Sequence, residues 1–152
     1  MRKLILMGRS QAGKTTLTQA LRGEEIHYYK TQDIHHYDSV IDTPGEYAQS
    51  HRLGKALALY TYEADVVGIL VAANEPYSLF PPNVTTQANR ECIGIVTKID
   101  VPNANVEQAD RWLKIAGCKT IFHVNSIKGE GVPAIIEFLS KEPEIKKIRA
   151  VD

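Results

Sequence analysis

The sequence predicts one α/β domain, a three-layer α/β/α sandwich around a mostly parallel sheet. Three observations support this. A short apolar run at residues 4–7 precedes a glycine-rich turn and then a segment with helical spacing. Further apolar runs of strand length alternate with amphipathic segments of helix length, the pattern of parallel strands joined by right-handed crossovers. The 152 residues, 43% of them hydrophobic and 24% charged, suit one domain with a sizeable core.

The glycine-rich turn carries the strongest motif of the chain. Residues 8–15 read Gly-Arg-Ser-Gln-Ala-Gly-Lys-Thr, the G-x-x-x-x-G-K-T pattern of a phosphate-binding P-loop, between a strand and a helix as the motif requires. Its backbone amides and the positive end of the helix can hold a phosphate. Lys14 is expected to reach the β- and γ-phosphates, and the Thr15 hydroxyl to bind Mg²⁺. The nucleotide-binding residues predicted here are Gly8, Ser10, Gln11, Ala12, Gly13, Lys14, Thr15 and Thr16.

The segment between the P-loop and the second strand is expected to supply a further Mg²⁺ ligand. The spacing predicts a helix at 16–22, a polar connection at 23–29, a short edge strand at 33–37 and a second strand at 40–41. Thr31 follows the polar connection, where a loop threonine can join Mg²⁺ when a γ-phosphate is present. An ordinary loop threonine is the alternative interpretation.

A D-x-x-G pattern ends the second strand, at residues 42–45. At a strand end after a P-loop, Asp42 is expected to hold Mg²⁺ through a water, and the Gly45 amide to contact a γ-phosphate. Glu46 is a candidate to orient or activate the attacking water. Its alternative role is that of an acidic residue favoured at the start of the helix predicted at 46–62. Because no catalytic arginine is identifiable, slow intrinsic hydrolysis is expected.

Periodicity, glycines and prolines predict the remaining elements. Three prolines in residues 74–90 exclude a long helix before Asn83, so at most a turn or two of helix is expected at 85–89. Gly117 is expected to stop a helix. In chain order we expect strands at 65–72, 93–97 and 120–124, helices at 106–116 and 132–139, and a charged tail at 142–152 after a domain at 1–141.

Two further stretches follow predicted strands and can recognise a base. Residues 97–100 read Thr-Lys-Ile-Asp, similar to the N-K-x-D pattern that recognises guanine in GTPases. The Asp100 carboxylate can accept hydrogen bonds from the ring N–H and exocyclic amine of guanine, donors that adenine lacks, and the Lys98 stem can cover the base plane. Thr97 replaces the usual asparagine and is shorter, which leaves ATP open beside GTP or GDP.

The second stretch, at residues 125–128, fits the last GTPase motif, in which loop amides meet the guanine oxygen. The carboxyl ends of parallel strands share one edge of a sheet, so these stretches are expected to gather on one rim with the P-loop. The predicted base-binding residues are Thr97, Lys98, Asp100, Asn125, Ser126 and Ile127.

The bulk composition narrows the partners and the compartment. The 18 basic and 18 acidic residues give a formal net charge of zero, so nothing in the composition indicates a nucleic acid or membrane partner. No apolar stretch approaches transmembrane length. Cys92 and Cys118 form no C-x-x-C motif and are expected to be buried free thiols in a reducing compartment. A cytoplasmic protein is therefore expected, and the oligomeric state is left open.

These motifs resemble the translation-factor-related P-loop GTPases, and more narrowly the EutP/PduV family of ethanolamine and propanediol utilisation. The specific parts of the resemblance are residues 41–47, Ile-Asp-Thr-Pro-Gly-Glu-Tyr, and residues 76–82, Pro-Tyr-Ser-Leu-Phe-Pro-Pro. Further support comes from Gln11 in the P-loop, from residues 30–32 and from residues 96–98. The resemblance implies a small Ras-like G domain of bacteria that build metabolic microcompartments.

Three functions follow as hypotheses. The first is a Mg²⁺-dependent GTP-binding and GTP-hydrolysing protein linked to microcompartment metabolism. The second, implied by the resemblance, is an acetate kinase-type phosphotransferase that uses ATP. The third is a module that binds microcompartment shell proteins, with residues 74–90 as the candidate surface, and needs nucleotide only for its structure.

Overall fold

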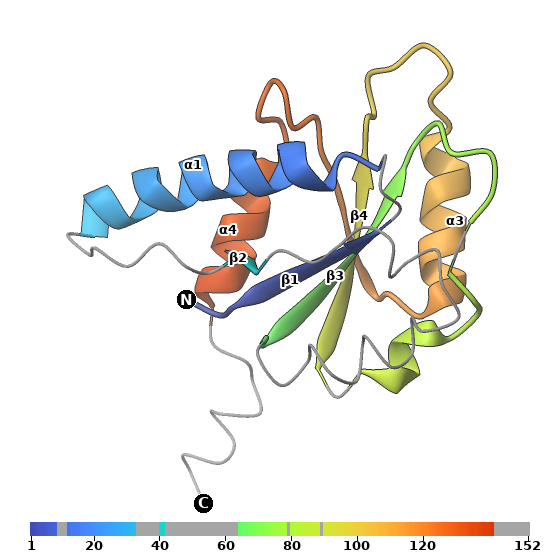
Figure 1. Cartoon of the computed structure of the whole chain (residues 1–152), viewed down its shortest axis with the longest axis horizontal. Coiled ribbons are helices and arrows are strands. Elements are labelled where there is room, and N and C mark those ends of the chain that lie inside the picture. Colours follow the sequence, from blue (N-terminus) through green and yellow to red (C-terminus); the bar gives the residue numbers. More distant parts are fainter. Residues whose placement is uncertain (9–11, 33–39, 42–63, 79, 89, 142–152) are drawn as a thin grey trace, which may run out of the picture.

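The structure is a computed structural model that describes residues 1–8, 12–32, 40–41, 64–78, 80–88 and 90–141. Within these ranges five parallel strands form one sheet in the order β2-β1-β3-β4-β5 (Figure 1). The strands are β1 (Leu4–Gly8), β2 (Val40–Ile41), β3 (Val66–Ala72), β4 (Glu91–Thr97) and β5 (Thr120–His123). The helices are α1 (Lys14–Gln32), α3 (Val106–Ala116) and α4 (Val132–Ser140), with a short 3-10 helix, η2, at Val84–Gln87.

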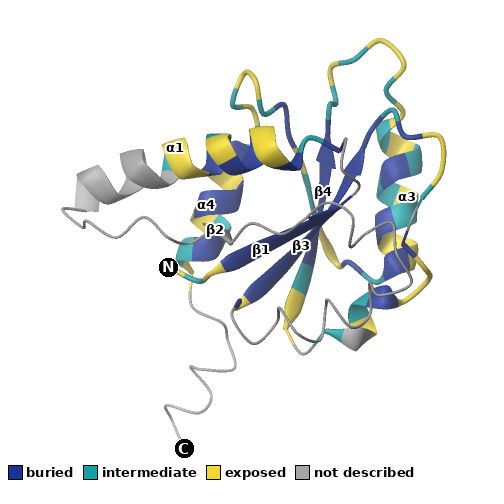
Figure 2. Ribbon diagram, viewed as in Figure 1, coloured by how far each residue is buried: buried dark blue, intermediate teal, exposed yellow. Residues whose placement is uncertain are grey.

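The helices cover the two faces of the sheet, as the three-layer prediction requires. Helices α1 and α4 lie on one face and α3 on the other (Figure 1). Alternate residues of β1 supply the two cores: Leu4 packs with the α1 and α4 side chains, whereas Ile5 packs with those of α3. Every residue of β1 and β3 is buried (Figure 2). Burial on both faces explains why these strands are continuous apolar runs rather than alternating ones.

Local signals fix both ends of α3. The Asn105 side chain accepts a hydrogen bond from the Gln108 amide at 3.1 Å and so caps the helix start. The helix ends at Gly117, whose φ of 112° lies in the left-handed region that favours glycine. A Cβ atom at this position would lie 2.0 Å from the Thr85 hydroxyl oxygen. The prediction that Gly117 stops the helix is confirmed.

Helix α1 is longer than predicted. It continues to Gln32 instead of ending at Arg22, so the predicted connection at 23–29 is wrong. The expected break was Gly23, which is exposed and has no neighbouring atoms within 4 Å of the space a Cβ would fill. One exposed glycine costs a helix only about 1 kcal/mol, and Glu24 and Glu25 both have high helix propensity.

The other predicted elements agree with the structure within a few residues. The stretch after β3 contains only the short η2 helix among its described residues, and β5 ends at His123, one residue before the predicted end. The predicted strand at 33–37, the helix at 46–62 and the tail at 142–152 lie outside the described residues.

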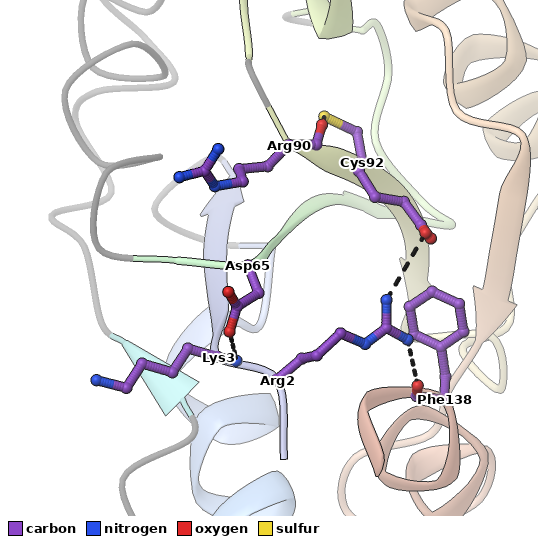
Figure 3. Close-up of polar contacts among 7 residues, drawn as sticks. Arg2, Lys3, Asp65, Arg90, Cys92 and Phe138 are labelled. Carbon is purple, nitrogen blue, oxygen red and sulfur yellow. Dashed lines mark hydrogen bonds and ion pairs between the residues drawn. The ribbon is translucent and has the colours of Figure 1, made fainter. Parts of the chain in front are cut away.

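At the amino-terminal edge of the sheet, Arg2 clamps the end of α4. Its guanidinium donates to the Phe138 carbonyl at 2.5 Å, lies 4.5 Å from the centre of the Phe138 ring, and lies 3.8 Å from the Glu91 carboxylate (Figure 3). The neighbouring Lys3 amide donates to Asp65 at 2.8 Å. A cation at a helix C-terminus interacts favourably with the helix dipole. This cluster is therefore structural and lies at the edge opposite to the P-loop.

Candidate nucleotide site

The strand order places the candidate site at the carboxyl ends of the strands. From β1 the chain passes to β2 on one side of β1, and later to β3 on its other side. In open α/β sheets ligands bind outside the carboxyl ends at such a switch point. Gly8, the last residue of β1, leads into the P-loop there. The P-loop and the stretches that follow β4 and β5 are predicted to lie together at this edge.

The described part of the P-loop has the geometry of an anion site. Gly13 has a φ of 87°, and its carbonyl accepts the first helical hydrogen bond of α1 from Leu17 at 2.9 Å. The amide N–H groups of the first helical turn have no acceptor within the helix. They form the positive end of the helix dipole, where an anion can accept from them. Lys14 is buried at the helix start, and Thr15 and Thr16 are exposed beside it. Ser10 and Gln11 lie outside the described residues.

Thr97 ties the P-loop to the base-recognition stretch. It is the last residue of β4 and only 2% exposed, and its hydroxyl donates to the carbonyl of the buried Ala12 at 2.5 Å. In the structure this hydroxyl therefore bonds to the P-loop, and the base contact of Thr97 stays a prediction. The next residue, Lys98, has a φ of 56°, a left-handed conformation that costs a non-glycine residue about 1 kcal/mol. This turn brings Thr97, Lys98, Asp100 and Val101 into the lining of one pocket.

A pocket of about 280 Å³ joins the two predicted motifs to the phosphate end. Two of its lining residues, Asn74 and Val101, were not predicted from the sequence. Asn74 follows the central strand β3 closely, so the rule that ligands bind at strand ends would have found it. The lining residues are Gly13, Thr16, Asn74, Thr97, Lys98, Asp100, Val101, Asn125, Ser126 and Ile127.

The loop after β5 holds a buried amide at this pocket. Asn125 is 3% exposed, and its backbone N–H donates to the Glu130 carbonyl at 3.0 Å, which closes the loop at its base. Its side-chain oxygen accepts from the Lys128 amide at 3.3 Å. Its side-chain nitrogen is buried and has no hydrogen-bond partner in the described part of the protein. Ile127, at the tip of this loop, is 88% exposed.

The described residues include only some of the predicted Mg²⁺ ligands, and they do not include the predicted γ-phosphate contact or the water-orienting residue. Thr15 is exposed on the first turn of α1, next to Lys14, and a hydroxyl there suits Mg²⁺ shared with phosphate oxygens and waters. Asp42, Gly45 and Glu46 lie outside the described residues. Thr31 does not fit the predicted loop position, because it lies in the last turn of α1. At about 1.5 Å per residue, that turn is about 25 Å along the axis from Lys14.

A second pocket, of about 400 Å³, lies at the opposite edge of the sheet. Glu91, Cys92, Lys119 and Thr120 line it at the starts of β4 and β5. The seven residues of β4 separate it from Thr97 by about 20 Å at 3.3 Å per residue. A phosphoryl acceptor must lie next to the γ-phosphate, so this pocket cannot hold one.

Both cysteines are free thiols, as predicted, but only Cys118 is buried as expected, and Cys92 is partly exposed. Burial raises the pKa of Cys92 to about 11, with a smaller contribution from the Glu91 carboxylate. Burial also raises the pKa of Cys118 to about 12, with Cys92 adding to the shift. Both thiols are thus protonated and unreactive at neutral pH. Among the helices that the structure describes, none is long and apolar enough to span a membrane.

A parallel sheet of this order, with the G-x-x-x-x-G-K-T loop after β1, has the fold of the Ras-like P-loop domains. The solved G domain of FeoB from Methanococcus jannaschii supports this fold, with a TM-score of 0.58 at 18% identity over 91% of this chain and 95% of that one. The PduV-EutP family, described as ethanolamine utilisation - propanediol utilisation, matches residues 1–141. The chain belongs to this family.

Two relatives show how the family likeness extends along the chain. The propanediol utilization protein PduV of Citrobacter freundii is 40% identical over 141 residues, which are 92% of this chain and 94% of that protein. A protein of Escherichia coli K12 described as probable acetate kinase EutP is 31% identical over 143 residues, covering 92% of this chain and 90% of that protein. The predicted resemblance is confirmed.

Proposed function

We propose that this protein binds GTP and GDP with Mg²⁺ and hydrolyses GTP slowly, in the cytoplasm and in association with ethanolamine or propanediol utilisation. The observation that carries the proposal is the pocket in which Gly13, Asp100 and the 125–127 loop meet. The phosphate loop follows β1, and the proposed base-recognition residues follow β4 and β5. The Thr97 hydroxyl, at the end of β4, donates to the Ala12 carbonyl of the phosphate loop. A nucleotide is the ligand that would occupy both the phosphate end and the base end of this pocket.

Each part of the pocket has a role in this proposal. The first-turn amides of α1 and Lys14 hold the phosphates, and Thr15 supplies a hydroxyl ligand for Mg²⁺. Asp100 accepts hydrogen bonds from the N1 and N2 donors of guanine. Mg²⁺, when bound, neutralises the charge that develops on the phosphates. Asp42, Gly45 and Glu46 retain their predicted roles, as Mg²⁺ contact, γ-phosphate contact and water-orienting carboxylate respectively.

Titrations with fluorescent GDP and ADP test the base assignment. Wild-type protein should bind GDP more tightly than ADP, and Asp100→Ala should remove the preference without affecting the fold, because Asp100 is exposed. Glu137→Ala, which removes an exposed carboxylate from α4, is the matched control and should retain the preference. ADP binding as tight as GDP binding, unchanged by Asp100→Ala, would refute the proposal.

An acetate kinase activity is the second candidate, because a relative at 31% identity is described as a probable acetate kinase. In this case the carboxylate of acetate replaces water as the phosphoryl acceptor, and Lys14 and Mg²⁺ serve the same phosphates. Trapping of acetyl phosphate with hydroxylamine, with ATP or GTP as donor, distinguishes the two. GTP hydrolysis should release inorganic phosphate at a rate that acetate does not change, and acetyl phosphate formed by wild type but not by Lys14→Ala would establish the kinase.

The loop at 74–90 is the proposed surface for a microcompartment shell protein. Within it Tyr77 is 53% exposed, a large aromatic side chain of the type enriched at protein interfaces. Co-purification with shell proteins should decrease for Tyr77→Ala at unchanged GDP affinity. Unchanged co-purification would remove this loop as the contact surface.

A further inference from the structure

We propose that the side-chain amide of Asn74 donates a hydrogen bond to N7 of the bound purine base. The inference rests on the proposed nucleotide function and adds to it a base contact that lies outside both base motifs of the sequence. Because guanine and adenine both carry N7, this contact strengthens binding without choosing between the two bases. It is therefore separate from the selection assigned to Asp100.

The position of Asn74 follows from the strand that precedes it. Strand β3 lies between β1, which leads into the P-loop, and β4, which leads into the base-recognition stretch (Figure 1). Ala72, the last residue of β3, pairs with Thr97, the last residue of β4. Asn74 comes two residues after Ala72 and lines the pocket together with Gly13 and Asp100. It therefore stands between the phosphate end and the base end of the pocket.

A tight turn after β3 leaves Asn74 at the surface of the pocket. The Glu75 backbone N–H donates to the Ala72 carbonyl at 3.0 Å, and the Ala72 N–H donates to the Glu75 carboxylate at 3.1 Å. Ala73 and Glu75, on either side of Asn74, are buried, whereas Asn74 is only half-buried. Of the residues in this turn, Asn74 is thus the one that a ligand in the pocket can reach.

The amide of Asn74 is available to a ligand. It makes no hydrogen bond within the described residues, and the buried side-chain atoms left without a partner there belong to Arg2 and Asn125. The amide oxygen and nitrogen of Asn74 are therefore open to solvent, and no bond prevents the NH₂ group from turning toward an acceptor. The Asn125 amide differs, because it is buried and accepts from the Lys128 N–H.

Guanine has an acceptor that the other proposed contacts leave unused. Asp100 accepts from N1 and N2, and the loop amides after β5 meet O6, so N7 remains without a donor. The Thr97 hydroxyl is not available for it, because it donates to the Ala12 carbonyl. Asn74 follows the strand next to Thr97, and its NH₂ group is an unused donor in the same pocket. The unused donor and the unused acceptor form the proposed contact.

The test compares GDP with 7-deaza-GDP, in which a C–H group replaces N7, and ADP with 7-deaza-ADP. Fluorescence competition gives the affinities for wild type, Asn74→Ala, the nearly isosteric Asn74→Leu, and the control Asn103→Ala, which changes an exposed asparagine outside the pocket lining. Wild type and the control should bind each deaza nucleotide about three- to tenfold more weakly than its parent, as expected for one neutral hydrogen bond. In both Asn74 variants this ratio should fall toward one, and the preference for GDP over ADP should match that of wild type.

Comparison within each pair separates the contact from other effects. A change in folding or in pocket shape weakens the parent and the deaza nucleotide alike and cancels in their ratio. Asn74 variants that keep the wild-type ratio, or a wild type that binds parent and deaza nucleotides equally, would show that no N7 contact is made.

Failure of the proposed function has a different signature. If wild type binds ADP as tightly as GDP, the guanine assignment is wrong, and the ADP pair still decides the Asn74 contact because adenine retains N7. If wild type binds none of the four nucleotides, the proposed function and the contact are both refuted.

Discussion

Replacing Thr97 by valine tests the tie between the P-loop and the base-recognition stretch. Valine has nearly the shape of threonine, so the change removes the hydroxyl and leaves the Ala12 carbonyl without its donor. Leaving a buried carbonyl without a hydrogen-bond donor lowers the free energy of unfolding by about 1–3 kcal/mol. The methyl group that replaces the hydroxyl recovers up to about 0.8 kcal/mol by burial. The expected loss of unfolding free energy is therefore about 1–2 kcal/mol.

Two measurements follow from this substitution. Thermal unfolding of Thr97→Val should show a melting temperature about 2–8 °C below wild type, since 1 kcal/mol corresponds to about 2–4 °C in a domain of this size. Nucleotide titration should show GDP and ADP weakened by the same factor, up to about tenfold, because the tie acts on the shared phosphate loop. The GDP to ADP ratio should be unchanged.

Thr97→Ser separates the hydroxyl from the packing. Serine keeps the donor but removes a buried methyl group, which costs about 1 kcal/mol of stability. The two variants should therefore be destabilised by similar amounts, and only Thr97→Val should lose nucleotide affinity. If Thr97→Ser loses as much affinity as Thr97→Val, or if neither variant does, the hydroxyl does not anchor the loop and the reasoning is refuted.

Three further predictions concern the scaffold. Arg2→Met should lower the free energy of unfolding by about 2 kcal/mol in denaturant titrations, through loss of a charge-assisted bond at a helix end, at unchanged GDP affinity; a change in affinity would contradict its structural role. Gly117→Ala should destabilise by more than 1 kcal/mol because of its φ of 112° and the close Thr85 hydroxyl, whereas Gly23→Ala in exposed helix should stabilise by about 0.5–1 kcal/mol. Folding raises both thiol pKa values above 9.0, so the unfolded chain loses these protons first and stability should fall as pH rises from about 9 toward 11. Titration of Cys92→Ala and Cys118→Ala between pH 8 and pH 11 should show a smaller decrease, and an unchanged decrease would assign it to other groups.

The sequence predicted the layers of the fold because the buried strands are apolar on both faces and the breaks between elements are chemically explicit. Gly117 after α3 and the prolines after β3 are such breaks. The end of α1 was mispredicted because Gly23 has the same local signature whether it ends a helix or sits exposed within one. Thr31 was misplaced as a consequence, since its expected loop depended on that ending.

The pocket residues were largely predictable, whereas their partners were not. Gly13, Asp100 and Asn125 follow strands that share one edge of the sheet, so topology alone brings them together. The bond between Thr97 and Ala12 joins residues 85 positions apart, and no local pattern specifies which acceptor a buried hydroxyl meets.

The proposed base contact of Asp100 bears on the choice between the two phosphoryl acceptors. A kinase that used ATP would leave the Asp100 carboxylate without the paired donors that guanine offers. If the proposed base assignment holds, the base end of the pocket disfavours ATP whatever the acceptor is. Acceptor choice depends on the other end, at Lys14 and the γ-phosphate, about which the base pocket carries no information. A carboxylate-directed transfer by this protein should for that reason use GTP more efficiently than ATP, and parallel assays with the two donors would decide it.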